Sequence, residues 1–182
     1  PKEVRPGDKI VMTGGRVGRD GIHGATFSSD TLPTGIPSSV VQIGNPIVQK
    51  KMMDVLLSAR DRGLYRGITD CGAGGLSSAI GEMGEKTGAE VNLERVPLKY
   101  DGIAPWEIWL SESQERMVLA VPPEKFEKLR NLFEDEDVDC SDIGTFTKDG
   151  RLKVKHGDTV LVDMAMAFLH DGVPKRSMES HW

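Results

Sequence analysis

The positions of glycine constrain this fold more than any other feature of the sequence, because short glycine-rich segments repeatedly interrupt the apolar runs. The chain has 21 glycines among 182 residues. They are densest in Gly14–Gly24 (GGRVGRDGIHG) and Gly72–Gly75 (GAGG). Glycine is favoured where the backbone must turn tightly or approach a ligand. We therefore expect short strands and helices joined by glycine loops.

The runs between the glycine loops have strand-like and helix-like patterns in alternation. The predicted strands are Lys9–Thr13, Gly67–Cys71, Ala89–Val96, Arg116–Val121, Ile143–Thr147, Leu152–Lys155 and Thr159–Val162. The predicted helices are Asn45–Arg62, Leu76–Lys86, Ala104–Leu110 and Pro122–Phe133. Asp149-Gly150 predicts a hairpin between its two flanking strands. Because the alternation lacks strict βαβ regularity, we predict an α/β or α+β fold: a mixed β-sheet with packed helices.

Composition limits the classes of function that this chain can have. No apolar run approaches the roughly 20 residues of a membrane span. The net charge is -5, with Lys and Arg scattered among acidic residues, so we expect neither nucleic acid nor a membrane as a partner. Cys71 and Cys140 form no CxxC pair, which favours two reduced thiols in a cytoplasmic protein.

The first candidate site is the glycine-rich segment that carries Arg16 and Arg19. Successive backbone N–H groups in such a segment can form an anion-binding nest, and guanidinium groups pair with phosphate in a bidentate manner. These features predict two phosphate-proximal arginines. A flexible loop with solvated charges explains the same composition equally well.

The second candidate is Asp70, at the end of a short predicted strand and before a glycine-rich helix start. A carboxylate at a strand end can bind Mg²⁺, which usually takes one or two carboxylates together with waters and phosphate oxygens. The same residue could cap the following helix. A third interpretation is a degenerate dinucleotide-binding motif, in which Ser77 replaces the last glycine.

Two further polar positions adjoin apolar runs. Ser111–Arg116 (SESQER) leads directly into the most apolar predicted strand, and a strand mouth is a common site location. Gln42 lies within the apolar run VVQIG, so its amide needs a hydrogen-bond partner. By themselves, an ordinary solvated turn and a backbone partner are sufficient explanations for these two features.

Taken together, four motifs resemble one family. GGRVGRDGIHGATFSS, VQIGNP, ITDCGAGGLSSAIGEM and SESQERM occur in the order typical of phosphoribosylformylglycinamidine synthase. The chain is similar to the C-terminal domain of the first aminoimidazole-ribonucleotide-synthetase-like half of its synthetase subunit, and the resemblance extends to about Arg176. We expect residues 1–176 to be one domain of a longer chain and 177–182 to be a disordered tail. Val17 departs from the usual Thr, and Cys71 from a common aliphatic residue.

The resemblance implies an ATP-dependent ligase of purine biosynthesis that converts formylglycinamide ribonucleotide to formylglycinamidine ribonucleotide. It implies that Gln42 contacts substrate, that Asp70 binds Mg²⁺, and that Glu112, Ser113 and Gln114 form a substrate-binding segment. ATP would be bound mainly by a domain that these residues do not include, so we expect no catalytic residue here and no turnover by the chain alone.

The implied partners are the rest of the synthetase chain, a glutaminase subunit and a small bridging subunit. Three other hypotheses remain open at the level of sequence. The chain could belong to another ATP-dependent enzyme of the superfamily, similar to selenophosphate synthetase. It could be a dinucleotide-binding oxidoreductase domain, or a non-catalytic module that packs on neighbouring domains.

Overall fold

Strand β1 (Lys9–Gly14) is buried on both of its faces, and its side chains explain why. Ile10 and Met12 point into one hydrophobic core and Val11 into a second, and all three are fully buried. Alternate side chains of a strand face opposite sides of a sheet, so an unbroken apolar run needs cover on both sides. The run KIVMT therefore requires packing layers on both faces of the sheet at β1.

The computed structural model describes residues 3–22, 44–174 and 177–178. Gln42 lies outside the described residues, as does most of the tail predicted for 177–182. The strands that accompany β1 are β2 (Gly67–Asp70), β3 (Ala89–Asn92), β4 (Arg116–Val121), β5 (Asp139–Phe146), β6 (Arg151–His156) and β7 (Thr159–Ala165). They form one seven-stranded sheet in the order β2-β4-β1-β5-β3-β6-β7.

Strand directions make the sheet mixed. The β3–β6 pair is parallel, whereas the other neighbouring pairs are antiparallel. This confirms the predicted mixed sheet with packed helices. It also rules out the dinucleotide-binding interpretation, because that fold needs a mostly parallel, doubly wound sheet, and here β2 is an edge strand antiparallel to β4.

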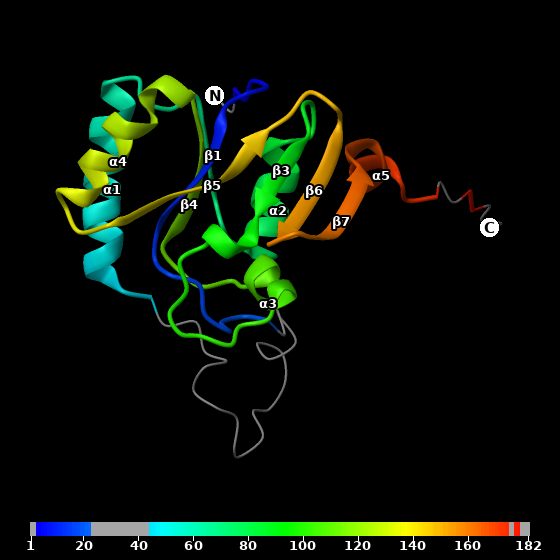
Figure 1. The fold of residues 1–182 in the computed structure, drawn as a ribbon, viewed down its shortest axis with the longest axis horizontal. Coiled ribbons are helices and arrows are strands. Elements are labelled where there is room, and N and C mark those ends of the chain that lie inside the picture. The colour runs from blue at the N-terminus through cyan, green and yellow to red at the C-terminus, as the bar shows by residue number, and fades with distance from the viewer. Residues whose placement is uncertain (1–2, 23–43, 175–176, 179–182) are drawn as a thin grey trace, which may run out of the picture.

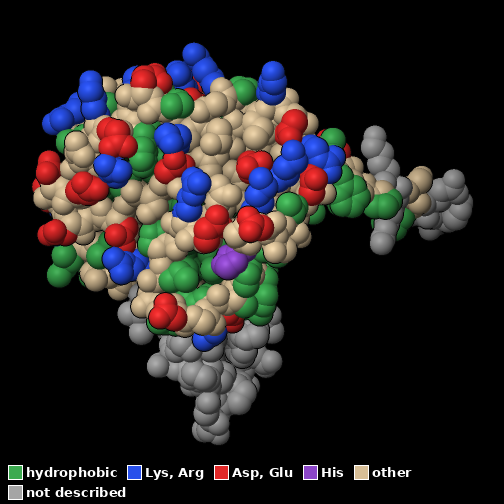
Figure 2. Space-filling view, viewed as in Figure 1, with side chains coloured by type: hydrophobic (Ala, Val, Ile, Leu, Met, Phe, Trp, Pro, Cys, Tyr) green, Lys and Arg blue, Asp and Glu red, His purple; other side chains and the backbone are tan. Residues whose placement is uncertain are grey.

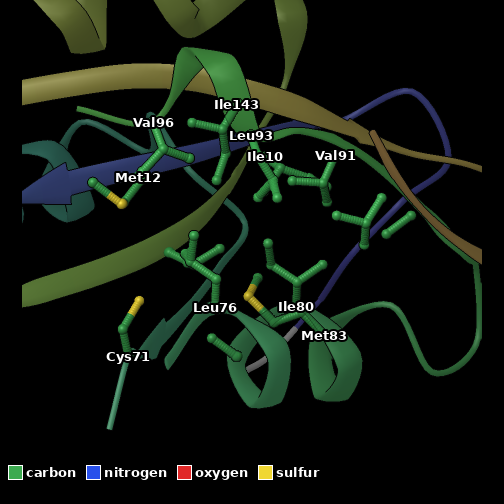
Figure 3. Packing of buried hydrophobic residues seen from close by; sticks show 14 of the residues in the cluster. Ile10, Met12, Cys71, Leu76, Ile80, Met83, Val91, Leu93, Val96 and Ile143 are labelled. Carbon is green, nitrogen blue, oxygen red and sulfur yellow. The ribbon is translucent and has the colours of Figure 1, made fainter. Parts of the chain in front are cut away.

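Helices cover both faces of the sheet (Figure 1). Helices α1 (Pro46–Asp61) and α4 (Phe126–Glu134) pack together over one core, which includes the fully buried Phe133. Helices α2 (Gly75–Met83) and α3 (Pro105–Leu110) cover the other. Figure 3 shows Leu76 and Ile80 of α2 directed at the β1 side chains.

The N-terminus of α1 forms as its sequence predicts. Asn45 is the N-cap, and its side-chain oxygen accepts hydrogen bonds from the backbone N–H groups of Ile47 at 3.1 Å and Val48 at 3.3 Å. Pro46 occupies the first helical position, where its fixed φ and missing N–H cost little. The helix ends at Asp61, just before Gly63, whose φ of +62° is left-handed. The chain therefore starts and stops this helix locally.

The predicted hairpin between β5 and β6 is wrong, because β3 lies between these two strands. The turn at Gly150 does form, with a φ of +65°. Its backbone bonds instead to the residues that precede β3: the Gly150 N–H donates to Thr87 O at 2.9 Å and the Thr147 N–H to Gly88 O at 3.0 Å. The predicted strand Ala89–Val96 is also shorter, since a 3-10 turn begins after Asn92.

The carboxylate of Asp149 in this turn should make stability pH-dependent. Its hydrogen bonds with Lys153 and Thr147 are the main causes that lower the pKa of Asp149 from 3.8 to about 2. A depressed folded-state pKa stabilises the fold above the unfolded value, and this contribution is lost as pH falls from about 4 towards about 2. We expect the stability gap between wild type and Asp149→Asn, measured by urea unfolding, to close across that window.

Asp158→Asn, in the exposed β6–β7 turn, is the charge-matched control for this measurement. A gap between wild type and Asp149→Asn that stayed constant from pH 5 to pH 2 would contradict the assignment.

One side of the surface carries a small apolar groove among otherwise mixed charges. Acidic and basic side chains are interspersed over the face in Figure 2, while hydrophobic side chains gather near α3 and the start of β7. The groove has a volume of about 300 Å³ and is lined by Leu93, Trp106, Trp109 and Leu161 among others. Trp106 is 55% exposed. None of the helices in the described residues is long and apolar enough to cross a membrane.

Candidate functional site

Residues Ser111–Arg116 (SESQER), which we call the 111–116 turn, connect α3 to β4 and are held from inside the protein. Arg116 is buried, with only 3% of its surface exposed. Its Nε donates to Ser113 O at 2.7 Å, and a terminal guanidinium nitrogen donates to Ser111 O. Burial is the main cause that lowers the pKa of Arg116. This buried support distinguishes the segment from an ordinary solvated turn.

Side chains along the turn alternate between inside and outside. Ser111 and Ser113 are fully buried, whereas Glu112 is half-buried and Gln114 is exposed. Glu115 has a left-handed φ of +56°, which is uncommon for a residue with a side chain. The turn therefore offers Glu112 and Gln114 to the surface and keeps its serines in the interior.

Both glycine-rich segments press against this turn through backbone atoms. A Cβ on Gly14 would lie 2.0 Å from Glu115 O, and one on Gly75 would lie 2.0 Å from Ser111 O. The N–H of Gly15 also donates to Glu115 O at 2.8 Å. Contacts this close require glycine, because a side chain has no room. The glycines thus bring separate loops onto the two ends of the 111–116 turn.

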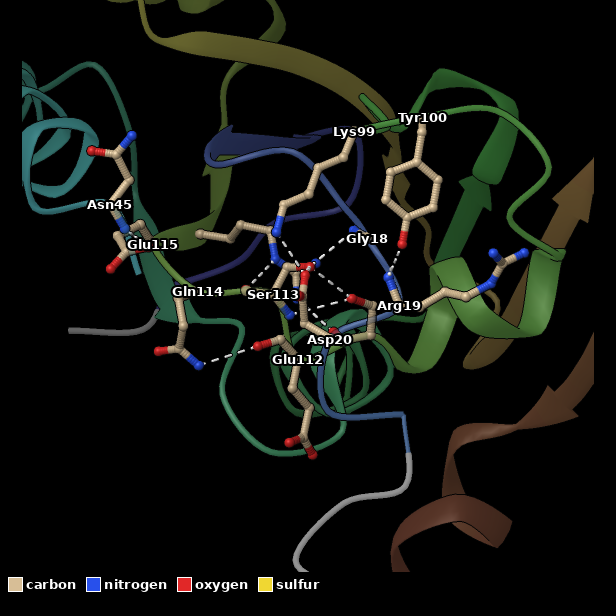
Figure 4. Close-up of polar contacts among 12 residues, drawn as sticks. Gly18, Arg19, Asp20, Asn45, Lys99, Tyr100, Glu112, Ser113, Gln114 and Glu115 are labelled. Carbon is tan, nitrogen blue, oxygen red and sulfur yellow. Dashed lines mark hydrogen bonds and ion pairs between the residues drawn. The ribbon is translucent and has the colours of Figure 1, made fainter. Parts of the chain in front are cut away.

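The loop that follows Gly14 is bonded to the middle of the turn (Figure 4). The Gly18 N–H donates to Ser113 Oγ at 2.9 Å, and that hydroxyl donates to the Asp20 carboxylate. The Glu112 N–H donates to Asp20 O at 2.8 Å, and Lys99 Nζ lies 2.7 Å from Asp20 Oδ2. Figure 4 shows Lys99, Asp20 and Ser113 converging on one point.

Asp70 lies at the end of β2, with its side chain exposed. Strand pairing sets it opposite Met117, one residue beyond the turn. The following loop reaches the turn itself, because the Gly74 N–H donates to Glu112 Oε1 at 3.1 Å. Helix α2 has Gly74 as its N-cap, so the interpretation of Asp70 as the cap is wrong.

Arg16 and Arg19 both form ion pairs. Arg16 Nε lies 2.7 Å from Asp139 Oδ2, and Arg19 Nε lies 2.8 Å from Glu107 Oε1. A backbone hydrogen bond from Ala104 and the bond from Arg19 lower the pKa of Glu107. The two arginine side chains remain 59% and 45% exposed. A phosphate at either position would have to share the guanidinium with a carboxylate.

Sequence reasoning did not single out Asp20, Lys99 or Glu115. Asp20 and Glu115 lie inside motifs that were recognised, so their positions carried a signal. Glu115 Oε2 accepts the Asn45 N–H at 3.0 Å, which attaches the start of α1 to the turn. Lys99 carried no local signal, because its contact with Asp20 spans 79 residues of sequence.

The chemistry of this region suits a divalent cation only if the protein shares its coordination with other ligands. The described residues contain no group of three or more His, Cys, Asp or Glu side chains that could hold a metal alone. Asp70 is an exposed carboxylate at a strand end. Mg²⁺ commonly takes one or two protein carboxylates and completes its shell with waters and substrate phosphates. Asp70 is suited to that partial role.

The fold and the site define the class: a mixed-sheet domain in which glycine loops and a polar turn meet at one end of the strands. Residues 5–157 match the family model described as "AIR synthase related protein, C-terminal domain", and the chain belongs to that family. Its resemblance to the synthase, inferred from four motifs, is confirmed by the following relatives.

The chain is 45% identical over 174 residues to the phosphoribosylformylglycinamidine synthase subunit PurL of Thermoplasma acidophilum, covering 93% of this chain and 23% of that protein. The Methanopyrus kandleri PurL is 42% identical over 180 residues, covering 96% and 25%. The chain thus spans about a quarter of the length of these curated relatives.

Solved structures agree with this placement. "T. maritima PurL complexed with FGAR" matches with a TM-score of 0.85 and 32% identity, covering 98% of this chain and 30% of that one. The hydrogenase maturation protein HypE of E. coli matches with a TM-score of 0.64 and 17% identity, covering 90% and 50%. At that identity, the likeness to HypE shows a shared fold alone.

Proposed function

We propose that this chain is the substrate- and Mg²⁺-binding part of an ATP-dependent ligase that converts formylglycinamide ribonucleotide to formylglycinamidine ribonucleotide in purine biosynthesis. The observation that carries the proposal is the meeting of three motifs at the 111–116 turn. The segment that begins at Gly14 and the glycine segment after Asp70, which includes Gly75, both contact this turn, and the turn is the third motif. Similar PurL structures complexed with FGAR and with ATP support the same chemistry.

Within this site, each polar group has a distinct role. The Glu112–Gln114 segment, together with Gln42, binds and orients the substrate. Asp70 contributes one ligand to Mg²⁺, which when bound neutralises phosphate charge during phosphoryl transfer. Arg16 and Arg19 lie near phosphate. Positioning is the main contribution that such a site can make, because the reacting oxygen must lie in line with the transferred phosphoryl group.

Parts of the synthetase beyond these residues complete the enzyme in this proposal. Those parts make most of the contacts with ATP and supply the catalytic groups. Residues 1–176 therefore act as one domain that does not turn over substrate by itself. The partners are the rest of the synthetase chain, a glutaminase subunit and a small bridging subunit, in a cytoplasmic enzyme. The structure "PurLQS from Thermotoga maritima" supports such an assembly. The apolar groove beside Trp106 suits packing against the remaining synthetase chain.

Titration of the chain with formylglycinamide ribonucleotide, followed by NMR, tests this function. We expect shifts at the backbone amides of Glu112 and Gln114. The variant Glu112→Gln should weaken binding about tenfold, because it removes a charged hydrogen-bond acceptor. Mg²⁺ should raise the affinity of the wild-type chain for the substrate but not that of Asp70→Asn. The exposed Asp101→Asn is the matched control and should respond to Mg²⁺ as the wild type does.

Three results would count against the proposal. Shifts confined to residues away from the turn would place the ligand elsewhere, and an unchanged Mg²⁺ effect in Asp70→Asn would remove the metal assignment. A measurable synthetase rate from the chain alone would contradict the absence of catalytic groups.

A further inference from the structure

The Ser113 hydroxyl is completely used by protein contacts. Ser113 is 0% exposed. Its Oγ donates to the Asp20 carboxylate, accepts the Gly18 N–H at 2.9 Å and lies 3.0 Å from Ser111 Oγ. A hydroxyl has one hydrogen to donate and two lone pairs. Since the hydrogen goes to Asp20, the two lone pairs serve Gly18 and Ser111, and no bonding capacity remains for a ligand.

The backbone of Ser113 is occupied as well. Its N–H donates to Ser111 Oγ at 3.2 Å, and its carbonyl accepts from Arg116 Nε at 2.7 Å. The side chains of the neighbouring Glu112 and Gln114 reach the surface, as expected when successive residues of an extended segment point in opposite directions. The central residue of the substrate-binding segment thus faces inward.

Asp20 holds both the side chain and the main chain of this segment. Its carboxylate, 13% exposed, accepts from Ser113 and pairs with Lys99 Nζ at 2.7 Å. Its backbone oxygen accepts the Glu112 N–H at 2.8 Å. A charged acceptor makes stronger hydrogen bonds than a neutral one. Loss of the charge would weaken the bond to Ser113 directly. It would loosen Glu112 indirectly, because the Asp20 backbone that accepts the Glu112 N–H would be held less firmly.

We propose that Asp20 and Ser113 are positioning residues, which set the direction of Glu112 and Gln114 and do not contact the substrate themselves. The proposal rests on the proposed function of the 111–116 turn. It assigns Ser113 an indirect role in that turn, and it assigns Asp20 a role that the sequence did not indicate. The two residues act as one unit, because the same hydrogen bond joins them.

Amide hydrogen exchange and substrate titration test the proposal in Asp20→Asn, Ser113→Ala and the double variant. Without ligand, exchange at the amides of Gly18 and Glu112 should rise about tenfold in each single variant, since local opening becomes easier. Affinity for formylglycinamide ribonucleotide should fall about tenfold in each. The double variant should be no worse than either single one, because coupled residues are not additive.

Asp142→Asn is the matched control, because Asp142 is also a partly buried carboxylate paired with one lysine, Lys9, and it lies on β5 away from the turn. Exchange at the turn should be unchanged in this variant. If Asp20→Asn fails to fold, Lys99→Met removes the outer partner of the same carboxylate and should give an effect of about threefold in the same direction.

Three outcomes would overturn the proposal. Variants that exchange faster at Glu112 and still bind substrate normally would show that the bonds are structural only. Additive losses of affinity, with unchanged exchange, would mean that Ser113 contacts the substrate directly. A wild-type chain that binds no formylglycinamide ribonucleotide would remove the proposed function, while the ligand-free exchange data would still report separately on the Asp20–Ser113 bond.

Discussion

Gly75→Ala is expected to destabilise the folded chain by about 3 kcal/mol or more and to displace the 111–116 turn. The added Cβ would lie 2.0 Å from Ser111 O, and Gly75 has a left-handed φ of +57°. Ser111 O cannot simply move away, because it accepts a hydrogen bond from the buried Arg116 guanidinium. Urea unfolding measures the loss, and NMR shifts at the turn measure the displacement.

Gly63→Ala separates the two causes of this effect. Gly63 has a similar φ of +62°, and a Cβ there would meet nothing within 4 Å. Backbone strain alone should cost about 1 kcal/mol. If the two alanine variants unfolded at the same urea concentration, the close approach of Gly75 to the turn would not be a constraint on this fold.

Arg116→Met should destabilise the chain by about 3 kcal/mol, the second of the two largest effects. Methionine retains an apolar stem of similar length, but it leaves the carbonyls of Ser111 and Ser113 without their donors inside the protein. The substrate-binding segment should lose its shape along with this support. Urea unfolding reports the stability, and exchange of the Glu112 amide reports the turn.

The matched control is Arg60→Met, on the surface of α1, where the arginine pairs with its neighbour Asp61. That substitution should change stability by less than about 0.5 kcal/mol. An Arg116→Met variant as stable as Arg60→Met would indicate that water reaches the two carbonyls and replaces the guanidinium.

Local signals predicted the elements of this fold better than their arrangement. Asn45-Pro46 gave the start of α1 because an N-cap acts within a few residues of itself. Strands β1 and β4 were likewise visible as apolar runs. The hairpin at Asp149-Gly150 was predicted wrongly, because turn chemistry reverses the chain but cannot exclude a third strand. Gly144 allows β3 to enter, since a Cβ there would lie 2.1 Å from Glu90 O.

The candidate site shows the same division. The sequence pointed to the motifs around Asp70 and Glu112, and their order identified the family. It left open whether the first glycine-rich segment forms an anion-binding nest or a flexible loop with solvated charges. In the structure, Gly14 and Gly75 are placed against carbonyls of the turn, which accounts for their lack of side chains.

By itself, the sequence determined most of the short strands and helices, the mixed character of the sheet and the family to which the chain belongs. Each of these features depends on residue patterns and motifs that are formed by neighbouring residues in the sequence. Only the tertiary structure decided that β3 separates β5 from β6, that Ser113 faces inward and that Asp20 holds it. The physical reason is that these contacts join residues far apart in the chain, 93 positions in the case of Asp20 and Ser113. Their formation depends on how the whole core packs.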